Sequence, residues 1–402
     1  MKGVSALACL ALLVAMGSGC TRSFVLEEDA RPWRTDAAAD SAALGDGGGD
    51  SSVILPDGKC VVPSSVDLLF VIDNSNSTSE VQVELASQLP NLIDAFLDPP
   101  DADGDGEPDY PPIDDIHLGV VTSDMGTGGF AIPTCTESDF GDDGVLRTEG
   151  STSIPGCSAT VPSFLTYLAP ADAREFVAQS RCVIVTGTGG CGFEQPLEAA
   201  LKAVTPSSAS ISFASGTPGH GDGVNAGFLR RDSMFAVIHA TDEDDCSARD
   251  PEVFNPTSTI AEGDLNLRCS NNPEMLHPVE RYVDGFRSLR PDRLDLFTFV
   301  VIAGVPLDLA PVGVTDAPGI GRILRDDRMQ ERLDPAMPLR LQPSCRTPEV
   351  GNAYPPRRLV TLARAFAGQS VVASLCQDDW TASIATIGST MGRRACTEYG
   401  PD

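Results

Sequence analysis

The stretch VDLLFVIDNSNS, residues 66–77, decides the fold of this chain. Residues 66–72 are apolar apart from Asp67. A short and nearly continuous apolar run is typical of a strand that is buried on both faces of a parallel sheet. In open α/β sheets, ligands bind just beyond the carboxyl ends of such strands. We therefore expect a buried parallel strand here, with the loop that starts at Asp73 in a binding position.

The rest of the chain alternates between helical and extended patterns. Residues 79–97 place leucines, Ile93 and Phe96 at helical spacing, and Pro90 among them predicts a kink or a break. Further strands are expected at 116–124, 233–241, 294–302 and 370–375, and further helices at 194–204, 274–289, 357–366 and 380–391. This alternation predicts an α/β fold with a doubly wound, Rossmann-like, mostly parallel sheet flanked by helices. Loop insertions are expected at about 98–115, 125–180, 205–232 and 303–356.

The N-terminus resembles a bacterial lipoprotein signal. Lys2 precedes the apolar segment 4–16, which is too short to span a bilayer, and small residues then lead into Cys20. The resemblance implies a signal peptide at 1–19 and a lipid-modified Cys20, which would anchor the protein to a membrane. Residues 20–58 hold few large apolar side chains and are expected to form a flexible acidic linker to a domain at 59–402. We expect an outer-membrane lipoprotein of the cell envelope, with secretion as the alternative.

The cysteines and the charge agree with export. Ten cysteines follow Cys20, at positions 60, 135, 157, 182, 191, 246, 269, 345, 376 and 396. An even number of scattered cysteines in an exported chain predicts disulfides, and Cys182 with Cys191 is a guess based only on proximity. The formal net charge of -29 argues against a nucleic-acid partner and against adsorption to anionic lipid. It suits either a cation-binding protein or a well-solvated surface protein.

The loop after the first strand carries three oxygen donors at alternate positions. Asp73, Ser75 and Ser77 alternate along the chain, so a nearly extended turn directs their oxygens the same way. A carboxylate and two hydroxyls are hard ligands that suit Mg²⁺, Mn²⁺ or Ca²⁺. Because Mg²⁺ keeps several waters, such a site leaves a position that a partner's carboxylate can take. The alternative is a D-x-S-x-S pattern that arises by chance in a serine-rich loop.

Three ordered features together resemble the von Willebrand factor A (VWA) domain. They are the strand that ends in D-x-S-x-S, a later Gly/Thr loop before a helix, and a strand that ends in Asp242. In that family, these elements form a metal-ion-dependent adhesion site on a Rossmann-like sheet. The resemblance implies that Asp73, Ser75 and Ser77 belong to the first metal-binding motif and that Asp242 is the second acid, usually held through water.

The third loop of this chain departs from the family's pattern. Thr188 is the nearest candidate for the family's middle threonine, but it lies early relative to the following helix. Cys191 is closer to the expected position, and Glu194 offers another oxygen within reach. Whether Thr188 or Glu194 supplies this ligand stays open, and so does the preferred metal. Asp244 and Asp245, which follow Asp242, are expected in a solvated loop.

A second acidic cluster, DADGDGEPD at 101–109, repeats the first six positions of an EF-hand loop. Asp101, Asp103, Asp105 and Asp109 are the candidate ligands. Pro112 stands where an EF-hand has its bidentate Glu, so a complete EF-hand is excluded. The segment looks more like the short calcium loops of thrombospondin type 3 or dockerin repeats. Ca²⁺ there would be structural, and the alternative is an acidic turn.

Catalytic motifs are sparse. The G-x-G-x-x-G pattern of Gly187, Gly189 and Gly192 lacks the acid about twenty residues later that a dinucleotide fold requires. The sequence contains no H-E-x-x-H and no G-x-S-x-G motif, and His239 inside an apolar strand is expected to be a core residue.

The leading hypothesis is a non-enzymatic, VWA-like binding protein. It would use Mg²⁺ or Mn²⁺ to hold an acidic group of a protein partner. The alternatives are a structural cell-envelope protein stabilised by calcium and disulfides, and a metal-dependent extracytoplasmic hydrolase. The oligomeric state stays open.

Overall fold

The computed structural model describes residues 63–101, 104–348 and 351–397. The chain divides into two compact units, 1–48 and 49–402, and the described residues all belong to the second unit. The expected signal peptide, Cys20 and the whole linker lie outside the described residues, as does Asp103 of the acidic loop.

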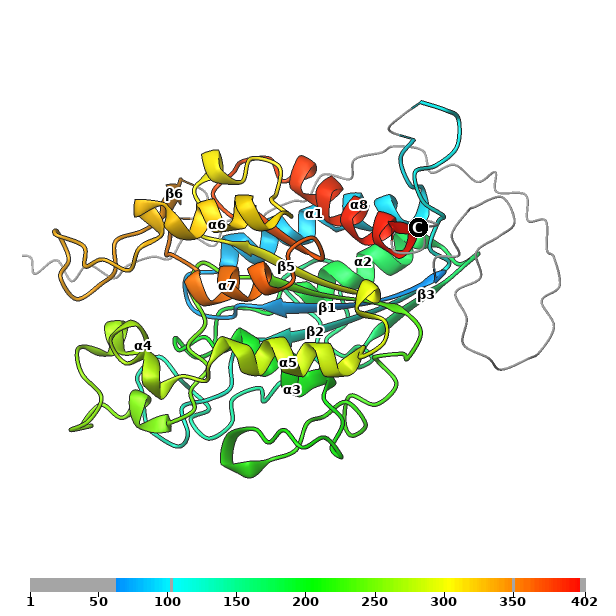
Figure 1. The fold of residues 1–402 in the computed structure, drawn as a ribbon. Helices are drawn as coiled ribbons and strands as arrows, with labels where there is room; N and C mark the ends of the chain where they lie inside the picture. The colour runs from blue at the N-terminus through cyan, green and yellow to red at the C-terminus, as the bar shows by residue number, and fades with distance from the viewer. Residues whose placement is uncertain (1–62, 102–103, 349–350, 398–402) are drawn as a thin grey trace, which may run out of the picture. The chain divides into compact units, whose positions relative to one another are not determined.

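A six-stranded sheet forms the centre of this unit, in the order β3-β2-β1-β4-β5-β8 (Figure 1). Its strands are β1 Ser65–Ile72, β2 Asp115–Thr122, β3 Leu165–Leu168, β4 Met234–Ala240, β5 Phe297–Ala303 and β8 Ser370–Ser374. All neighbouring pairs are parallel except β2 and β3, which are antiparallel. Counted within this sheet, the order is 3-2-1-4-5-6, the order of doubly wound Rossmann-type sheets. The predicted α/β fold with a mostly parallel sheet is confirmed.

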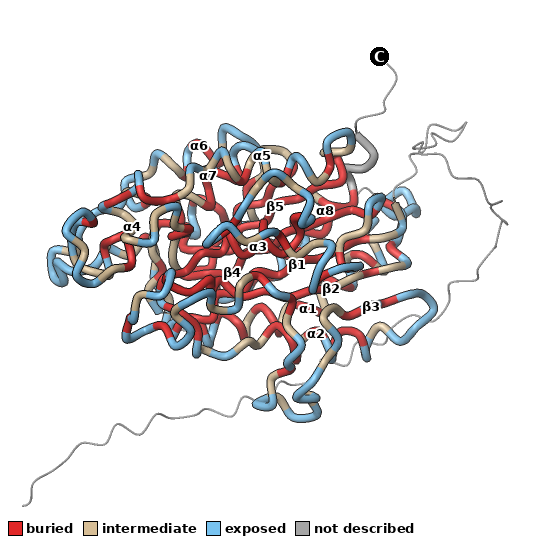
Figure 2. Tube along the Cα trace, turned by 90° about the horizontal axis from the view of Figure 1, so that it is seen from below, coloured by how far each residue is buried: buried red, intermediate tan, exposed pale blue. Residues whose placement is uncertain are grey.

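Helices cover both faces of the sheet, which explains why β1, β4 and β5 are apolar without alternation. Leu68 and Phe70 of β1 pack in one core with α1, α2 and α8, while Leu69 and Val71 pack in a second core with α3, α5, α6 and α7. Figure 1 shows α3 and α5 on one side of the sheet and α1 and α8 on the other, and Figure 2 shows the strands buried between them. The helices are α1 Ser79–Leu97, α2 Ala173–Ile184, α3 Pro196–Val204, α4 Arg268–Asn271, α5 Val279–Leu289, α6 Ala317–Arg325, α7 Arg357–Ala365 and α8 Thr381–Thr397.

Short elements complete the unit. A separate two-stranded sheet pairs β6 Cys345–Thr347 with β7 Gly351–Ala353. Single 3-10 turns lie in the loops, at Ala214–Gly216, Pro251–Phe254, Leu265–Leu267, Pro273–Met275, Leu294–Leu296, Leu307–Leu309 and Asp327–Met329.

The strands and helices expected from the sequence are present, but some of their bounds differ and two expected insertions contain further elements. The sequence predicts a kink or a break at Pro90; helix α1 continues through it, so the break is wrong and the kink stays a prediction. The buried face on either side of the proline, which includes Leu85, Leu89 and Leu92, holds the helix together despite the lost hydrogen bond. The stretch 125–180 is not only loop, because it contains the edge strand β3 and most of helix α2. The expected insertion 303–356 likewise contains α6, β6 and β7, and the helix expected at 274–289 begins only at Val279.

Four disulfides join the described cysteines: Cys135–Cys191, Cys157–Cys182, Cys246–Cys269 and Cys345–Cys376. The guessed Cys182–Cys191 pair is wrong, because each of these cysteines pairs with one from the 125–180 insertion, which folds back on the segment that follows it. Four disulfides indicate an extracytoplasmic protein.

None of the helices in the described ranges is both long enough and apolar enough to cross a membrane.

Candidate functional site

The candidate site lies where the sheet changes its winding direction. β1 and β4 are adjacent in the sheet, and the chain leaves β1 towards β2 but leaves β4 towards β5 on the other side. Asp73 directly follows β1, and Asp242 is the second residue after β4. The Asp73 amide donates a hydrogen bond to the Ala240 carbonyl at 3.1 Å. The two expected acids are therefore brought to the crevice in which doubly wound sheets bind their ligands.

Asp73 is buried, with 1% of its surface exposed. Its Oδ1 accepts the Ser75 amide at 2.8 Å, and its Oδ2 accepts the Thr241 hydroxyl at 2.6 Å. The Ser75 hydroxyl also hydrogen-bonds this carboxylate, yet burial outweighs these bonds and raises the pKa of Asp73. Because a carboxylate offers about four lone-pair positions, Asp73 keeps acceptor capacity for a cation.

Gln82, a residue that the sequence analysis did not single out, connects the Asp73 loop to the loop that contains Gly187 and Thr188. Gln82 of α1 donates to the Asp73 carbonyl at 2.8 Å. The same side chain exchanges two hydrogen bonds with the backbone of Gly187, at 2.8 and 3.0 Å. Thr188 follows Gly187 but is only half-buried and does not line the cavity at the site. Gln82 and Thr241 are thus supporting residues, and no motif in the sequence marks either of them.

Ser75, Ser77 and Asp242 converge at the floor of that cavity. The hydroxyls of Ser75 and Ser77 are 3.3 Å apart, and a hydrogen bond from Ser77 lowers the pKa of Asp242. Burial, together with the charges of Asp73 and Glu243, nevertheless raises the pKa of Asp242 well above its usual range. Among the described residues, no group hydrogen-bonds the buried Asp242 Oδ1. A buried carboxylate oxygen without a partner is costly, so this atom calls for a positive charge or a donor.

Two further acids add negative charge at the same place. Glu194 is 3% exposed, and burial followed by the charges of Glu243, Asp73 and Asp242 raises its pKa well above its usual range. Burial, with Asp73 next in importance, raises the pKa of Glu243 to about 7. Four carboxyl groups therefore destabilise each other's charged forms. A divalent cation among them would reverse that effect.

The acidic side chains that the structure describes do not make a metal site alone, so the serine hydroxyls would have to take part in binding a hard cation. In the part of the chain that the structure describes, no three His, Cys, Asp or Glu side chains come close enough to form a metal site by themselves. Ser75 and Ser77 would have to complete a set that starts from Asp242 and Asp73. Carboxylate and hydroxyl oxygens are ligands that Mg²⁺ and Mn²⁺ accept, with water in the remaining positions.

Glu194 takes the third-loop position next to the site, and Cys191 does not. Ser75, Ser77, Asp242 and Glu194 all line a cavity of about 530 Å³. Asp73 is not among the lining residues; it is buried and accepts the Ser75 amide. Cys191 is bonded to Cys135 and cannot act as a thiolate ligand. Thr188 and Glu194 were the two open candidates, and Glu194 is the one at the cavity.

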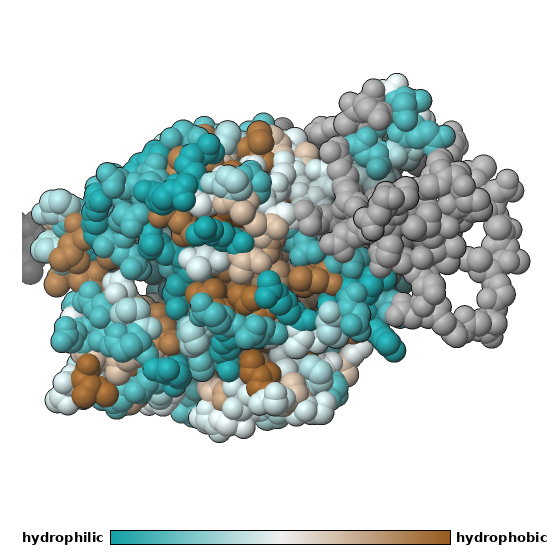
Figure 3. All heavy atoms as spheres, viewed as in Figure 1, coloured by the Kyte–Doolittle hydropathy of each residue, from teal (hydrophilic) through white to brown (hydrophobic). Residues whose placement is uncertain are grey.

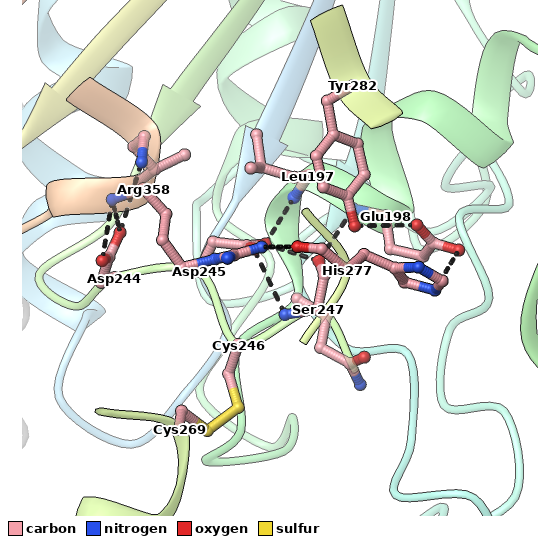
Figure 4. Close-up of polar contacts among 12 residues, drawn as sticks. Leu197, Glu198, Asp244, Asp245, Cys246, Ser247, Cys269, His277, Tyr282 and Arg358 are labelled. Atoms are coloured by element: carbon pink, nitrogen blue, oxygen red, sulfur yellow. Dashed lines mark hydrogen bonds and ion pairs between the residues drawn. A yellow bond between two sulfur atoms is a disulfide. The ribbon is translucent and has the colours of Figure 1, made fainter. Parts of the chain in front are cut away.

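The predicted solvated loop at Asp244 and Asp245 is wrong (Figure 4). The Asp244 carboxylate accepts the amides of Arg358 at 2.9 and 3.0 Å and of Leu359 at 3.3 Å, at the start of α7. Asp245 is 2% exposed, forms an ion pair with Arg358 at 3.0 Å and accepts the Leu197 amide at 3.0 Å. Both acids thus tie the loop after β4 to helices α3 and α7 and hold Asp242 in place.

A neighbouring polar cluster fixes α3 against α5. Glu198 accepts hydrogen bonds from Arg281 at 2.8 and 3.1 Å and from the Tyr282 hydroxyl at 2.9 Å. Burial lowers the pKa of His277 to about 4, so the imidazole beside Glu198 is neutral at neutral pH. Figure 4 shows Tyr282 and His277 directed at Glu198. This cluster therefore fixes the position of α3, the helix that begins just after Glu194.

The acidic loop lies at the opposite edge of the sheet, since it precedes β2 rather than following a strand. Its Asp101 carboxylate accepts the amides of Gly104, Asp105 and Gly106 at 2.7, 3.1 and 2.9 Å. These bonds satisfy Asp101 within the loop itself, and Asp103 is not described. Calcium binding by Asp101, Asp105 and Asp109 stays a prediction.

His239 is a core residue, as expected. It is fully buried in β4, and its ring lies 5.0 Å from that of Phe299. Neither ring nitrogen has a hydrogen-bond partner among the described residues, and burial lowers the pKa of His239 to about 3.

No model of a known protein family matches this sequence, and no characterised protein matches it at the significance required of a relative.

Proposed function

We propose that this protein binds a divalent cation, Mg²⁺ or Mn²⁺, at the Asp73 loop and uses it to hold a carboxylate of a protein partner. The observation that carries the proposal is the buried Asp242 Oδ1 without a partner, next to the Ser75 and Ser77 hydroxyls on the floor of an open cavity. A site of this chemistry is incomplete without a cation. The proposal takes the fold as VWA-like, on the strength of the D-x-S-x-S loop and Asp242 at the winding switch.

The residues of the site would contribute different kinds of oxygen ligand. Ser75 and Ser77 offer neutral hydroxyl oxygens at the cavity surface, and Asp73 and Asp242 offer the negative charge. The bound cation would supply positive charge to a ligand carboxylate. Burial and neighbouring acids raise the pKa values of Glu194 and Glu243 at the same end of the cavity, so a further carboxylate is unfavourable there without the cation. Partner binding therefore follows cation binding.

The same proposal makes the protein a binding module of the cell envelope rather than an enzyme. Four disulfides support an extracytoplasmic location. The lipoprotein-type signal before Cys20 supports an anchor in the outer membrane.

Calorimetric titration of the metal-stripped protein with Mg²⁺, Mn²⁺ and Ca²⁺ tests the proposal. Binding should occur in the wild type and disappear in Asp73→Ala and in Asp242→Asn. Asp105→Ala, in the acidic loop, is the matched control and should leave this binding unchanged. Heat that survives in both site variants but disappears in the control would place the cation at the acidic loop. That result would favour the structural, calcium-stabilised envelope protein instead.

A further inference from the structure

Two projecting segments form opposite walls of the cavity. On one side, residues 332–342 form a hairpin, with the Asp334 amide bonded to the Arg340 carbonyl at 2.9 Å and the Gln342 amide to the Arg332 carbonyl at 2.7 Å. On the other side lies the segment 255–272, which contains α4. Both contribute lining residues, Arg340 and Leu341 from the hairpin and Leu265 and Cys269 from the α4 segment. Figure 1 shows the two segments at the left of the view, the hairpin above and the α4 segment below.

Both segments also expose apolar side chains outside the lining of the cavity. On the hairpin, Leu333, Met337 and Leu339 are 53%, 42% and 57% exposed. On the α4 segment, Ile260 is 61% exposed. In Figure 3, hydrophobic atoms lie on both projections at the left edge, with a hollow between them.

Arg340 gives the cavity a cation within electrostatic reach of its acids, since its charge lowers the pKa of Glu243 against the larger effect of burial. Its side chain is exposed and hydrogen-bonds the Tyr354 hydroxyl, while the Tyr354 amide donates to the Asp242 carbonyl at 2.8 Å. No ion pair joins Arg340 to any carboxylate within the described ranges. The other arginine of the cavity, Arg358, is already occupied by Asp244 and Asp245. Arg340 is therefore the guanidinium that a ligand can reach.

Three of the four disulfides stiffen the surroundings of the cavity. Cys135–Cys191 holds the loop that carries Glu194, and Cys246–Cys269 joins the loop after β4 to the α4 segment. Cys345–Cys376 joins the segment just after the hairpin to the segment just after β8. A prearranged cavity loses little conformational entropy when it takes up an extended ligand.

We infer that the cavity takes an extended segment of a partner protein that carries two acidic side chains and an aliphatic one. One carboxylate reaches the cation at Ser75 and Ser77, which rests on the proposed function. The second carboxylate binds Arg340, and the aliphatic side chain lies on Leu265 and Leu341. A cavity of about 530 Å³ accommodates a few side chains rather than a folded domain. The acids of the cavity need a cation, and the exposed Arg340 guanidinium lies on its wall, so the cavity selects a segment with two separate acids.

Selection from a random peptide library on the immobilised, full-length protein in Mg²⁺ tests the inference. Selected peptides should share two acidic residues and a nearby aliphatic residue, and EDTA should release them. Arg340→Ala should weaken binding of a selected peptide about threefold to tenfold, as expected for an exposed charge pair. Arg340→Lys keeps the positive charge and should therefore weaken binding less than Arg340→Ala. Arg332→Ala is the matched control on the same hairpin, because Arg332 is exposed and paired with Asp327 at 2.9 Å.

The outcomes separate the two proposals. Peptides that bind equally to the wild type and to Arg340→Ala, but still need the cation, would overturn the Arg340 contact and leave the cation-dependent function intact. Peptides that remain bound in EDTA and in Asp73→Ala would overturn the proposed function. Selected peptides without acidic residues, or no enrichment over Asp73→Ala, would overturn the inference. Self-association of the protein that Arg340→Ala abolishes would place a second copy of the chain in the cavity instead.

Discussion

From the buried Asp242 carboxylate we predict two effects of Asp242→Asn on stability, which have opposite signs without and with the cation. Asp242→Asn keeps the size of the side chain and can still accept the hydrogen bond from Ser77, but it removes the negative charge beside Asp73 and Glu243. Without a cation, that charge is buried and one of its oxygens has no partner among the described residues. The variant should therefore be more stable than the wild type when metal is absent.

The expected gain is about 1–3 kcal/mol in the free energy of unfolding, the scale of an unsatisfied buried polar or charged group. The low end applies if the raised pKa of Asp242 lets the metal-free protein take up a proton and avoid part of the cost. Cation binding reverses the order of stability. At a free cation concentration of about a hundred times Kd, the wild type gains about 2.7 kcal/mol. The variant gains nothing, because it has lost a ligand.

Denaturant unfolding with intact disulfides measures both effects on the same samples. The midpoints for the wild type and Asp242→Asn are compared in EDTA and then in excess Mg²⁺. The variant should unfold at the higher denaturant concentration in EDTA and at the lower one in Mg²⁺. A variant that is less stable than the wild type in EDTA, or that gains as much from Mg²⁺, would refute the account of Asp242 as an uncompensated metal ligand.

Two further predictions concern the supports of the site. Arg358→Leu leaves Asp245 buried without its ion-pair partner and should lower the free energy of unfolding by about 3–5 kcal/mol, whereas the exposed Arg332→Leu should lower it by no more than about 1 kcal/mol. Equal effects of the two substitutions in denaturant unfolding would contradict the role given to Asp245. Because burial lowers the pKa of His239 to about 3, the unfolded chain binds a proton between pH 6.5 and 3 that the native state excludes, and stability should fall with pH in this window by up to about 1.4 kcal/mol per pH unit. His239→Leu should flatten the slope of the unfolding free energy between pH 6.5 and 4, and an unchanged slope would show that His239 is protonated in the native state.

The fold could be predicted because the central strands are almost continuously apolar. The run 66–72 has no alternation, which only a strand covered on both faces requires, and the same holds for 233–241 and 294–302. Asp73, Ser75, Ser77 and Asp242 could be placed together for a related reason. Residues that directly follow parallel strands meet at the carboxyl edge of the sheet whatever the loops do.

The parts that escaped prediction depend on contacts between distant segments. A run of four acids is usually solvated, but Arg358, 113 residues away along the chain, gives Asp245 a buried partner. Disulfide pairing depends on how the 125–180 insertion folds back, which no local pattern records. The walls of the cavity, the 332–342 hairpin and the α4 segment, have no helical or alternating period, so their meeting across the site could not be foreseen.

Crystals soaked in Mn²⁺ and measured near the manganese absorption edge would test the central claim most directly. The account predicts an anomalous-difference peak on the cavity floor beside Asp73 and Asp242. The peak should lie about 2.1 Å from the Ser75 and Ser77 hydroxyls, and it should be absent from Asp242→Asn crystals. A peak at Asp101–Asp109 with none beside Ser75 and Ser77 would contradict the claim that the cation binds at the winding switch of the sheet.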